Sequence, residues 1–259
     1  DVCSSDLKGA DVNQRDANNF TPLFMATHTR TMDTNNEVPW TISEDPMPVI
    51  RNLLEAGADP NIRVKDTPSN RSSQGGTKAW IKMSGGTVLM RAAFAGDIEL
   101  IRLLLRYGAD PGINANDKTT PLMAAAGLGV IPGYQRDRSE AETVATVKLL
   151  VELGNDVNAA NDAGRTALHG AASAGRNAVV QTLVDLGGRL DARDKGSADS
   201  KEPLVPLDYA IGVRVNGQSA IPQPQTEELI RKLMADRGIK HTTSECTLRG
   251  FTCGDVRSE

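Results

Sequence analysis

Two short motifs alternate along this chain at a regular spacing, and this spacing constrains the fold more than any other sequence feature. The first contains Gly-Ala-Asp and occurs within residues 8–13, 56–61 and 107–111, with looser copies at 154–158 and 187–191 and a degenerate one at Gly238. The second follows the pattern Thr-x-Leu and begins at Thr21, Thr87, Thr120 and Thr166, with Val205-Pro206-Leu207 as a fifth copy. Thr87 and Thr120 are 33 residues apart, as are Gly154 and Gly187. A constant period of this length indicates a repeat protein.

Each repeat is predicted to form two short helices. Thr followed by Pro begins a helix well, because Thr can cap the first free N–H groups and Pro has no N–H to leave unpaired. Alanine runs such as 124–126 keep the first helix thin, and an apolar stripe such as Ile101, Leu104 and Leu105 marks the second helix. The glycine that follows supplies the left-handed residue that ends the helix. One such pair cannot bury its own stripe, but a stack of pairs can.

Both motifs recur in phase over residues 8–240, and on them the chain resembles the ankyrin repeat family. The resemblance implies an all-α solenoid of about five helix–turn–helix repeats with long loop insertions. We expect a repeat domain at 8–241, with repeats at approximately 16–63, 84–114, 115–159, 160–193 and 194–241, followed by a tail at 242–259. Insertions are expected between the helices near 29–45, 130–142 and 214–224, and in the extended connections, called fingers, near 64–83 and 196–202. Such loop-broken repeats look like those of ankyrin proteins from environmental bacteria.

The first seven and the last three residues are not expected to belong to the fold. Residues 1–7 resemble the translation of a short-read sequencing adapter, and residues 257–259 resemble its reverse complement. An ordinary polar N-terminus is the alternative. We expect residues 1–7 and 257–259 to be artefactual and the chain to be a fragment of a longer product, with N-terminal repeats or a cap missing before the partial finger at 8–15.

The composition argues against several classes of function. A net charge of −4 disfavours nucleic acid as a partner, and no apolar run approaches the roughly 18 residues of a membrane span. The three histidines are scattered and no Cys-x-x-Cys pair is present, so a zinc site has little support. No nucleophile elbow, phosphate-binding glycine loop or paired-carboxylate motif stands out. We therefore expect no catalytic residues, no metal, no cofactor and no enzyme activity.

The family resemblance implies where a protein partner would bind, because ankyrin partners usually contact the finger tips and the exposed face of the first helix. At the finger tips this implicates Asn18, Asn19, Asp117, Lys118, Asp162 and Arg165. On the first-helix face it implicates Met25, His28, Arg91, Phe94, Ala124, Leu128, Gly170, Ser173 and Tyr209. Bulky residues in the first repeats and small ones in the third and fourth predict a shallow depression. The alternative is that these positions are merely solvated.

Several residues in and beyond the helices allow two readings. Trp40 and Trp80 lie in insertions, where they either bind a partner or fold back against the side of the stack. His169 occupies the histidine of the family's Thr-Pro-Leu-His motif, which implies a structural hydrogen bond. Cys246 and Cys253 either form a disulfide in an oxidising compartment or remain free thiols. If they are bridged, a periplasmic or secreted location is favoured over the cytoplasm.

The function we expect is non-catalytic protein–protein recognition through the finger tips, the concave first-helix face and the inserted loops, by a chain that is monomeric as a fragment. One alternative is an accessory segment of a larger envelope or redox enzyme whose catalytic domain lies outside the sequence. A second is direct binding of a glycan or small ligand by the tryptophan-bearing loops. A fold of this kind indicates that the protein acts by binding, but it does not identify the partner.

Overall fold

The fold is a stack of helix pairs. The computed structural model describes residues 9–31, 45–65, 84–129, 139–196, 202–212 and 221–241, and over these ranges it contains ten α-helices and no strand. The first helices of the pairs are α2 (Pro22–Thr31), α4 (Val88–Phe94), α6 (Pro121–Ala126), α8 (Ala167–Ser173) and α10 (Pro206–Ile211). The second helices are α3 (Met47–Glu55), α5 (Ile98–Arg106), α7 (Glu140–Glu152), α9 (Asn177–Asp185) and α11 (Pro224–Asp236). The predicted all-α solenoid is confirmed.

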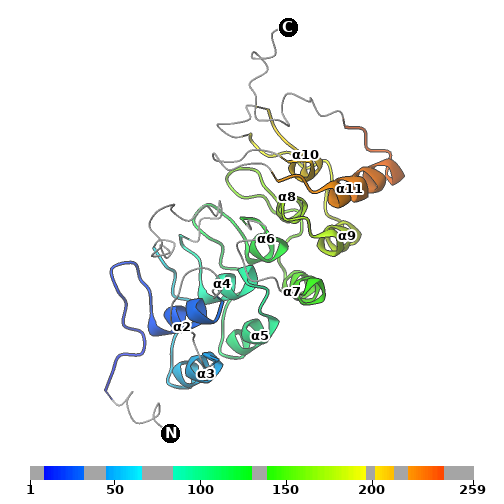
Figure 1. Cartoon of the computed structure of the whole chain (residues 1–259). Coiled ribbons are helices and arrows are strands. Elements are labelled where there is room, and N and C mark those ends of the chain that lie inside the picture. Colours follow the sequence, from blue (N-terminus) through cyan, green and yellow to red (C-terminus); the bar gives the residue numbers. More distant parts are fainter. Residues whose placement is uncertain are drawn as a thin grey trace.

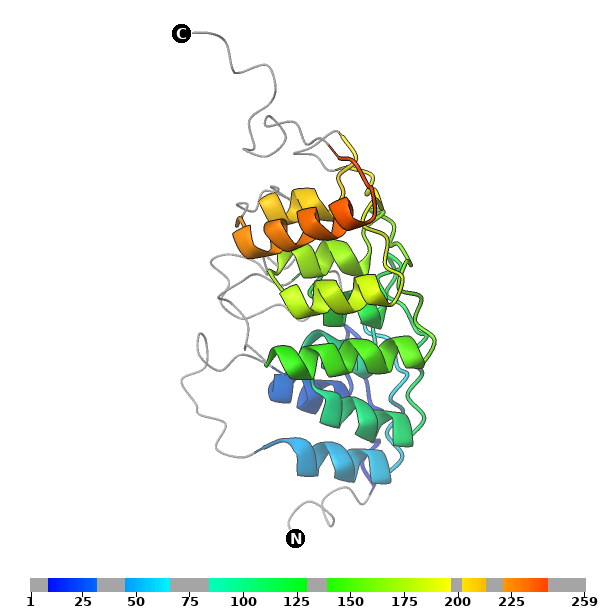
Figure 2. The ribbon, with the colours of Figure 1, turned by 90° about the vertical axis from the view of Figure 1, so that its right-hand side faces the viewer.

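Neighbouring pairs contact each other in chain order. Each first helix packs against the first helix of the next pair, and the second helices do the same. The pairs therefore form a stack in chain order (Figure 1). Seen from the side, α3, α5, α7, α9 and α11 lie one above another, and the segments that connect the pairs run together along one edge (Figure 2). The solenoid therefore presents one continuous edge made of fingers.

The threonines of the first three repeat motifs, Thr21, Thr87 and Thr120, cap their first helices, as the sequence predicts. The hydroxyl oxygens of Thr21 and Thr120 each accept a hydrogen bond, at 3.1 Å, from the backbone N–H three residues later. The fifth pair has Val205 at this position, and there the Asp208 carboxylate accepts from the Val205 N–H at 2.9 Å instead. The start of α10 thus keeps the bond from the third helical residue back to the capping N–H, which is the reciprocal half of a capping box.

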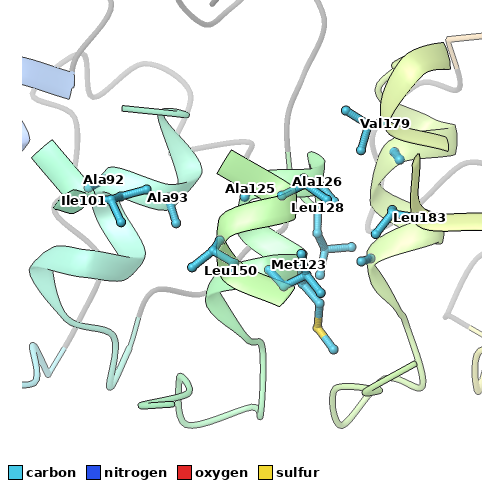
Figure 3. Close-up of a cluster of buried hydrophobic side chains, with 14 of the residues drawn as sticks. Ala92, Ala93, Ile101, Met123, Ala125, Ala126, Leu128, Leu150, Val179 and Leu183 are labelled. Carbon is cyan, nitrogen blue, oxygen red and sulfur yellow. The ribbon is translucent and has the colours of Figure 1, made fainter. Parts of the chain in front are cut away.

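The core runs through the stack without interruption. Alanine pairs on the first helices, such as Ala92-Ala93 and Ala125-Ala126, are fully buried and let neighbouring helices approach closely. Ile101, Leu150 and Leu183 from the second helices belong to the same cluster (Figure 3). Because the cluster spans all five pairs, the apolar stripe of each pair is buried mainly by its neighbours.

Asparagines join one repeat to the next along the finger edge. The Asn13 side chain donates to the Gly57 carbonyl at 3.1 Å and accepts from the Asp59 N–H at 2.8 Å. Asn61 makes the same two bonds, each 2.8 Å long, to Gly108 and Asp110. Asn158 repeats them with Gly187 and Arg189, at 3.0 and 2.9 Å. Each asparagine therefore bridges two fingers through one donor and one acceptor.

Two repeats depart from this pattern: Asp191 occupies this position in the copy at 187–191 and pairs with Arg189, and a glycine occupies it directly after the copy at 107–111. Gly112 occupies the position held by Asn13, Asn61 and Asn158, and so has no side chain to reach the next finger. There Asn155 reaches back from the following repeat and donates to the Pro111 carbonyl at 3.2 Å. A single bond in the opposite direction thus replaces the paired bonds.

Replacing Asn61 by Ala tests whether this bridge stabilises the stack. The variant leaves the Gly108 carbonyl and the Asp110 N–H without their partner, which we expect to lower the free energy of unfolding by about 1 to 2 kcal/mol in urea titrations. Asn114→Ala, at an exposed position of the next finger, is the matched control and should change stability by less than about 0.5 kcal/mol. Equal effects of the two changes would contradict a bridging role.

Candidate functional site

The finger turns are fixed to one another by backbone hydrogen bonds. The Lys65 N–H donates to the Asn18 carbonyl, and the Asp162 N–H donates to the Asp117 carbonyl, each at 2.8 Å. The Asn116 N–H donates to Ser84 at 2.8 Å and the Lys195 N–H donates to Ala163 at 2.9 Å. The tips are therefore set at fixed relative positions by main-chain bonds, to which side chains such as those of Asn19 and Lys195 add bonds of their own. This row of turns is called the finger edge below.

Within the finger edge, the same left-handed turn conformation occurs at two tips. Asn19 and Lys118 both have φ of 63°, in the left-handed region that non-glycine residues seldom occupy. The Lys118 ammonium lies 2.9 Å from the Asp162 carboxylate, which belongs to the next finger, and the two side chains are 72% and 52% exposed. An ion pair this exposed contributes little to stability, so both charges remain accessible to a partner.

The structure places most of the predicted fingertip residues on the surface. Asn18, Lys118 and Asp162 are exposed, and Asn19 and Asp117 are half-buried. These five residues lie along one edge of the stack, as the sequence predicts. Whether they bind a partner stays a prediction.

Arg165 differs from the other predicted fingertip residues, because its side chain is buried. Its Nε donates to the Tyr209 hydroxyl at 2.9 Å, and that hydroxyl donates to the Asp194 carboxylate at 2.6 Å. Burial raises the pKa of the Tyr209 hydroxyl, which therefore stays protonated as a donor. The prediction that Arg165 and Tyr209 are exposed is wrong: they hold the fourth repeat to the fifth.

His169 joins the same buried cluster, in agreement with the structural role that the resemblance implies. Its Nδ1 accepts from the Thr166 N–H at 3.1 Å, and its Nε2 lies 3.2 Å from the Leu204 carbonyl, so the neutral ring with the proton on Nε2 fits both contacts. The ring packs edge-on against Tyr209 with centroids 5.0 Å apart. Burial lowers the pKa of His169 to about 4.

The first-helix face is partly covered, which corrects further predictions. Met25 is 44% exposed, and His28, Arg91 and Ser173 are half-buried. The remaining positions predicted on this face are buried: Phe94, Ala124, Leu128 and Gly170.

Small residues on the first helices do not leave the predicted depression in the third and fourth repeats. A Cβ added at Gly170 would lie 2.4 Å from the backbone nitrogen of Leu128. The turn of the preceding repeat thus occupies the space that the missing side chain leaves. Small residues here serve close packing between repeats, so Leu128 and its neighbours are not available to a partner.

Arg91 is tied to the first repeat. Its Nε donates to the Thr31 hydroxyl at 2.9 Å, and its guanidinium lies 5.7 Å from the centroid of the Phe94 ring. His28 continues an aromatic stack, with ring centroids 5.2 Å apart for Phe20–Phe24 and 6.3 Å apart for Phe24–His28. Burial and the Arg91 charge lower the pKa of His28 to about 4, so the ring is neutral at pH 7.

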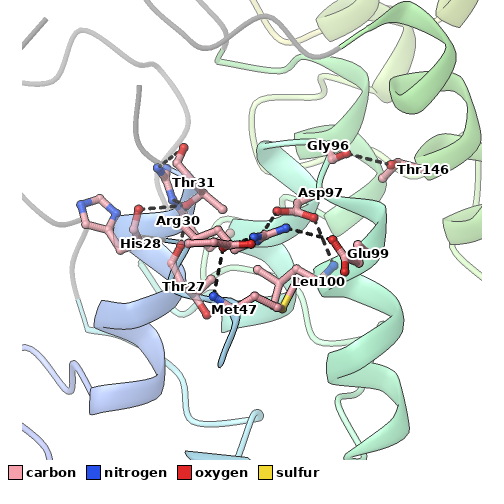
Figure 4. A network of polar contacts seen from close by, with 12 residues as sticks. Thr27, His28, Arg30, Thr31, Met47, Gly96, Asp97, Glu99, Leu100 and Thr146 are labelled. Carbon is pink, nitrogen blue, oxygen red and sulfur yellow. Dashed lines mark hydrogen bonds and ion pairs between the residues drawn. The ribbon is translucent and has the colours of Figure 1, made fainter. Parts of the chain in front are cut away.

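One polar cluster was not predicted from the sequence. Arg30 Nε lies 2.8 Å from the buried Asp97 carboxylate, its Nη2 lies 3.2 Å from Glu99, and Nη1 pairs with Asp45 (Figure 4). The same Asp97 caps α5 by accepting from the Leu100 N–H at 3.1 Å. One guanidinium therefore links the first two helix pairs. The two acidic residues at the start of α5, Asp97 and Glu99, indicate a site for a cationic side chain. The sequence does not show that this side chain is Arg30.

Other predicted residues lie outside the described ranges. These are Trp40, Trp80, Cys246 and Cys253, together with residues 1–7 and 257–259. The roles of the tryptophan-bearing loops and the disulfide therefore stay predictions.

The described part of the chain was searched for metal-binding groups and for membrane-spanning helices. Among them, no group of three or more His, Cys, Asp or Glu residues is placed to hold a metal ion. No helix in these ranges is long and apolar enough to cross a membrane. The buried Arg165, Tyr209 and Asp194 pair with one another, which is the behaviour of a structural network.

Comparison with known proteins agrees with the geometry. The family described as ankyrin repeats (three copies) matches residues 40–135 and 89–195. The chain therefore belongs to the ankyrin repeat family, whose repeats are generally protein–protein interaction modules and typically not catalytic. The chain is also similar to the E3 ubiquitin-protein ligase KEG of Arabidopsis thaliana, with 30% identity over 128 residues. That match covers 49% of this chain and 6% of the ligase.

Histidine burial predicts a pH-dependent stability. The pKa of His169 is about 4 when folded and about 6.5 when unfolded, so the unfolded chain binds an extra proton between these values. Stability is therefore lost as the pH falls through this window, by about 2 kcal/mol between pH 6.5 and 4.5. His169→Gln keeps one acceptor and one donor without titrating, and should show a shallower slope in urea titrations. Identical slopes for the two proteins would contradict this assignment.

Proposed function

We propose that this chain binds a protein partner through the finger edge and the adjoining exposed part of the first-helix face. The observation that carries the proposal is the backbone bonding between finger turns. It holds exposed tips such as Asn18 and Lys118 at fixed spacing before any partner arrives. A surface that is already ordered loses little conformational entropy on binding, which favours affinity.

The exposed residues suggest how the partner would be recognised. Lys118 and Asp162 present opposite charges side by side, and Asp117 adds a second carboxylate nearby in sequence. Complementary charges steer association and set specificity more than they add affinity. The partner would then carry a mixed-charge patch facing the third and fourth fingers.

A charge swap tests this surface without removing the ion pair. Lys118→Glu combined with Asp162→Lys keeps one charge of each sign at the two native positions, which are paired at 2.9 Å in the wild type, but inverts the pattern that a partner meets. Arg102→Glu, at an exposed position on α5, is the control. Each tagged protein would be incubated with a cell extract, and the proteins captured by wild type would be purified and titrated against all three.

We expect the swap to weaken binding of the captured partner at least tenfold, while Arg102→Glu changes it less than twofold. Circular dichroism would check that all three proteins are equally folded. Binding that survives the swap but is lost in Arg102→Glu would move the interface to the second helices.

A second candidate function is that of an accessory repeat segment in a larger enzyme. It is favoured by one observation: the matched relative is named as a ligase, and the matching region is 6% of its length. In that case the same surface would hold a substrate or another domain of the enzyme. The swap variant would then impair that enzyme toward protein substrates without changing its action on a minimal substrate.

A further inference from the structure

At the positions of Pro22 and Val49, the first helix pair exposes apolar residues where every later pair is buried. Met25 and Val49 are 44% and 43% exposed, and Pro22 and Pro48 are exposed beside them. These four residues of α2 and α3 are called the α2–α3 face. At the position of Val49, later repeats have side chains with no exposure at all: Leu100, Thr146, Val179 and Ile230. At the position of Pro22 they have buried Val88, Pro121, Ala167 and Pro206.

In the later repeats these positions are covered by the preceding repeat. At the position of Met25, Arg91 bonds to Thr31 of the first pair, and Gly170 lies against Leu128 of the third repeat. At the position of Val49, the Thr146 hydroxyl donates to the Gly96 carbonyl of the second repeat at 3.4 Å (Figure 4). The α2–α3 face is therefore the half of an inter-repeat interface that belongs to the following repeat.

Residues 9–16 have the form of a finger that joins two repeats. Gly9 has φ of 96°, close to the values of 90°, 82°, 94° and 92° at the glycines that follow second helices, Gly57, Gly108, Gly154 and Gly187. Asn13 makes the same paired bonds as Asn61 and Asn158. This finger thus directs whatever is attached to it toward the α2–α3 face.

The opposite end of the stack is different. Arg231 of α11 occupies the position that Ile50, Ile101, Val147 and Val180 fill with fully buried apolar side chains. It is exposed and lies 2.8 Å from the Glu227 carboxylate on the same helix. A polar outer face is what a terminal capping repeat requires. Because this end is polar, the C-terminal end of a second copy would not match the α2–α3 face.

We propose that the α2–α3 face is a docking surface for a further ankyrin helix pair, attached through the finger at residues 9–16. This pair stacks as the internal pairs do and covers Pro22, Met25, Pro48 and Val49. The turn between its two helices faces Val49, as the turn at Gly96 faces Thr146 in the third repeat. The proposal concerns assembly of the stack and is independent of binding at the finger edge.

Fusion of the chain's own repeats tests the proposal. Residues 160–187 or 84–108, each a complete helix pair that ends in the equivalent glycine, would replace residues 1–9 ahead of Ala10. We expect amide hydrogen exchange in α2 and α3 to slow at least tenfold in at least one fusion, since the added pair covers their outer face. Unchanged exchange in both fusions would overturn the proposal, because α2 and α3 remain measurable even if the added segment stays unfolded.

Val49→Asp is the discriminating variant. In the original chain the side chain is exposed, so the change should alter exchange of α2 and α3 less than twofold; in the fusion it should abolish the slowing. Sedimentation equilibrium of the original chain should show a monomer. A dimer that Val49→Asp dissociates would overturn the proposal in favour of a second copy on this face.

Discussion

Contact between neighbouring helix pairs is the interaction on which the rest of the structure depends. Each second helix carries a stripe of Leu, Ile or Val that its own short first helix cannot cover, and buried alanines such as Ala125 and Ala126 bring the next pair close enough to complete the coverage. The glycine at position 170 shows how close this approach is, because it leaves no room for a Cβ against Leu128. Stability is therefore a sum over interfaces rather than a property of any one repeat.

The same stacking explains why the fingers form a surface suited to recognition. Once the pairs are stacked, the turns that connect them are brought side by side and bond through their backbones, as Asp162 does with Asp117. The side chains of Lys118 and Asp162 are then not needed to hold these turns together. These residues can therefore vary with the partner that the protein binds. The exposed Lys118–Asp162 ion pair contributes little to the stability of the fold.

The helix pairs could be predicted from the sequence because both motifs act locally. Thr caps the helix that it precedes, and Gly ends the helix that it follows, whatever lies beyond. Exposure of the first-helix residues could not be predicted so well, because it depends on the neighbouring repeat. Arg165 and Tyr209 are buried because Asp194 reaches them from the next finger, and Phe94 and Leu128 are buried by adjacent repeats. The partners of Arg30 likewise come from two separate segments of the chain.

The most direct test of this account is to separate one repeat from its neighbours. A peptide of residues 160–193 contains α8, α9 and the glycine that ends α9, but none of the helices that cover them in the stack. If inter-repeat contact supplies the stability, far-ultraviolet circular dichroism should show little helix and no cooperative thermal transition for this peptide, while the whole chain melts cooperatively. A peptide that is as helical as the same residues in the stack, and unfolds cooperatively alone, would contradict the account.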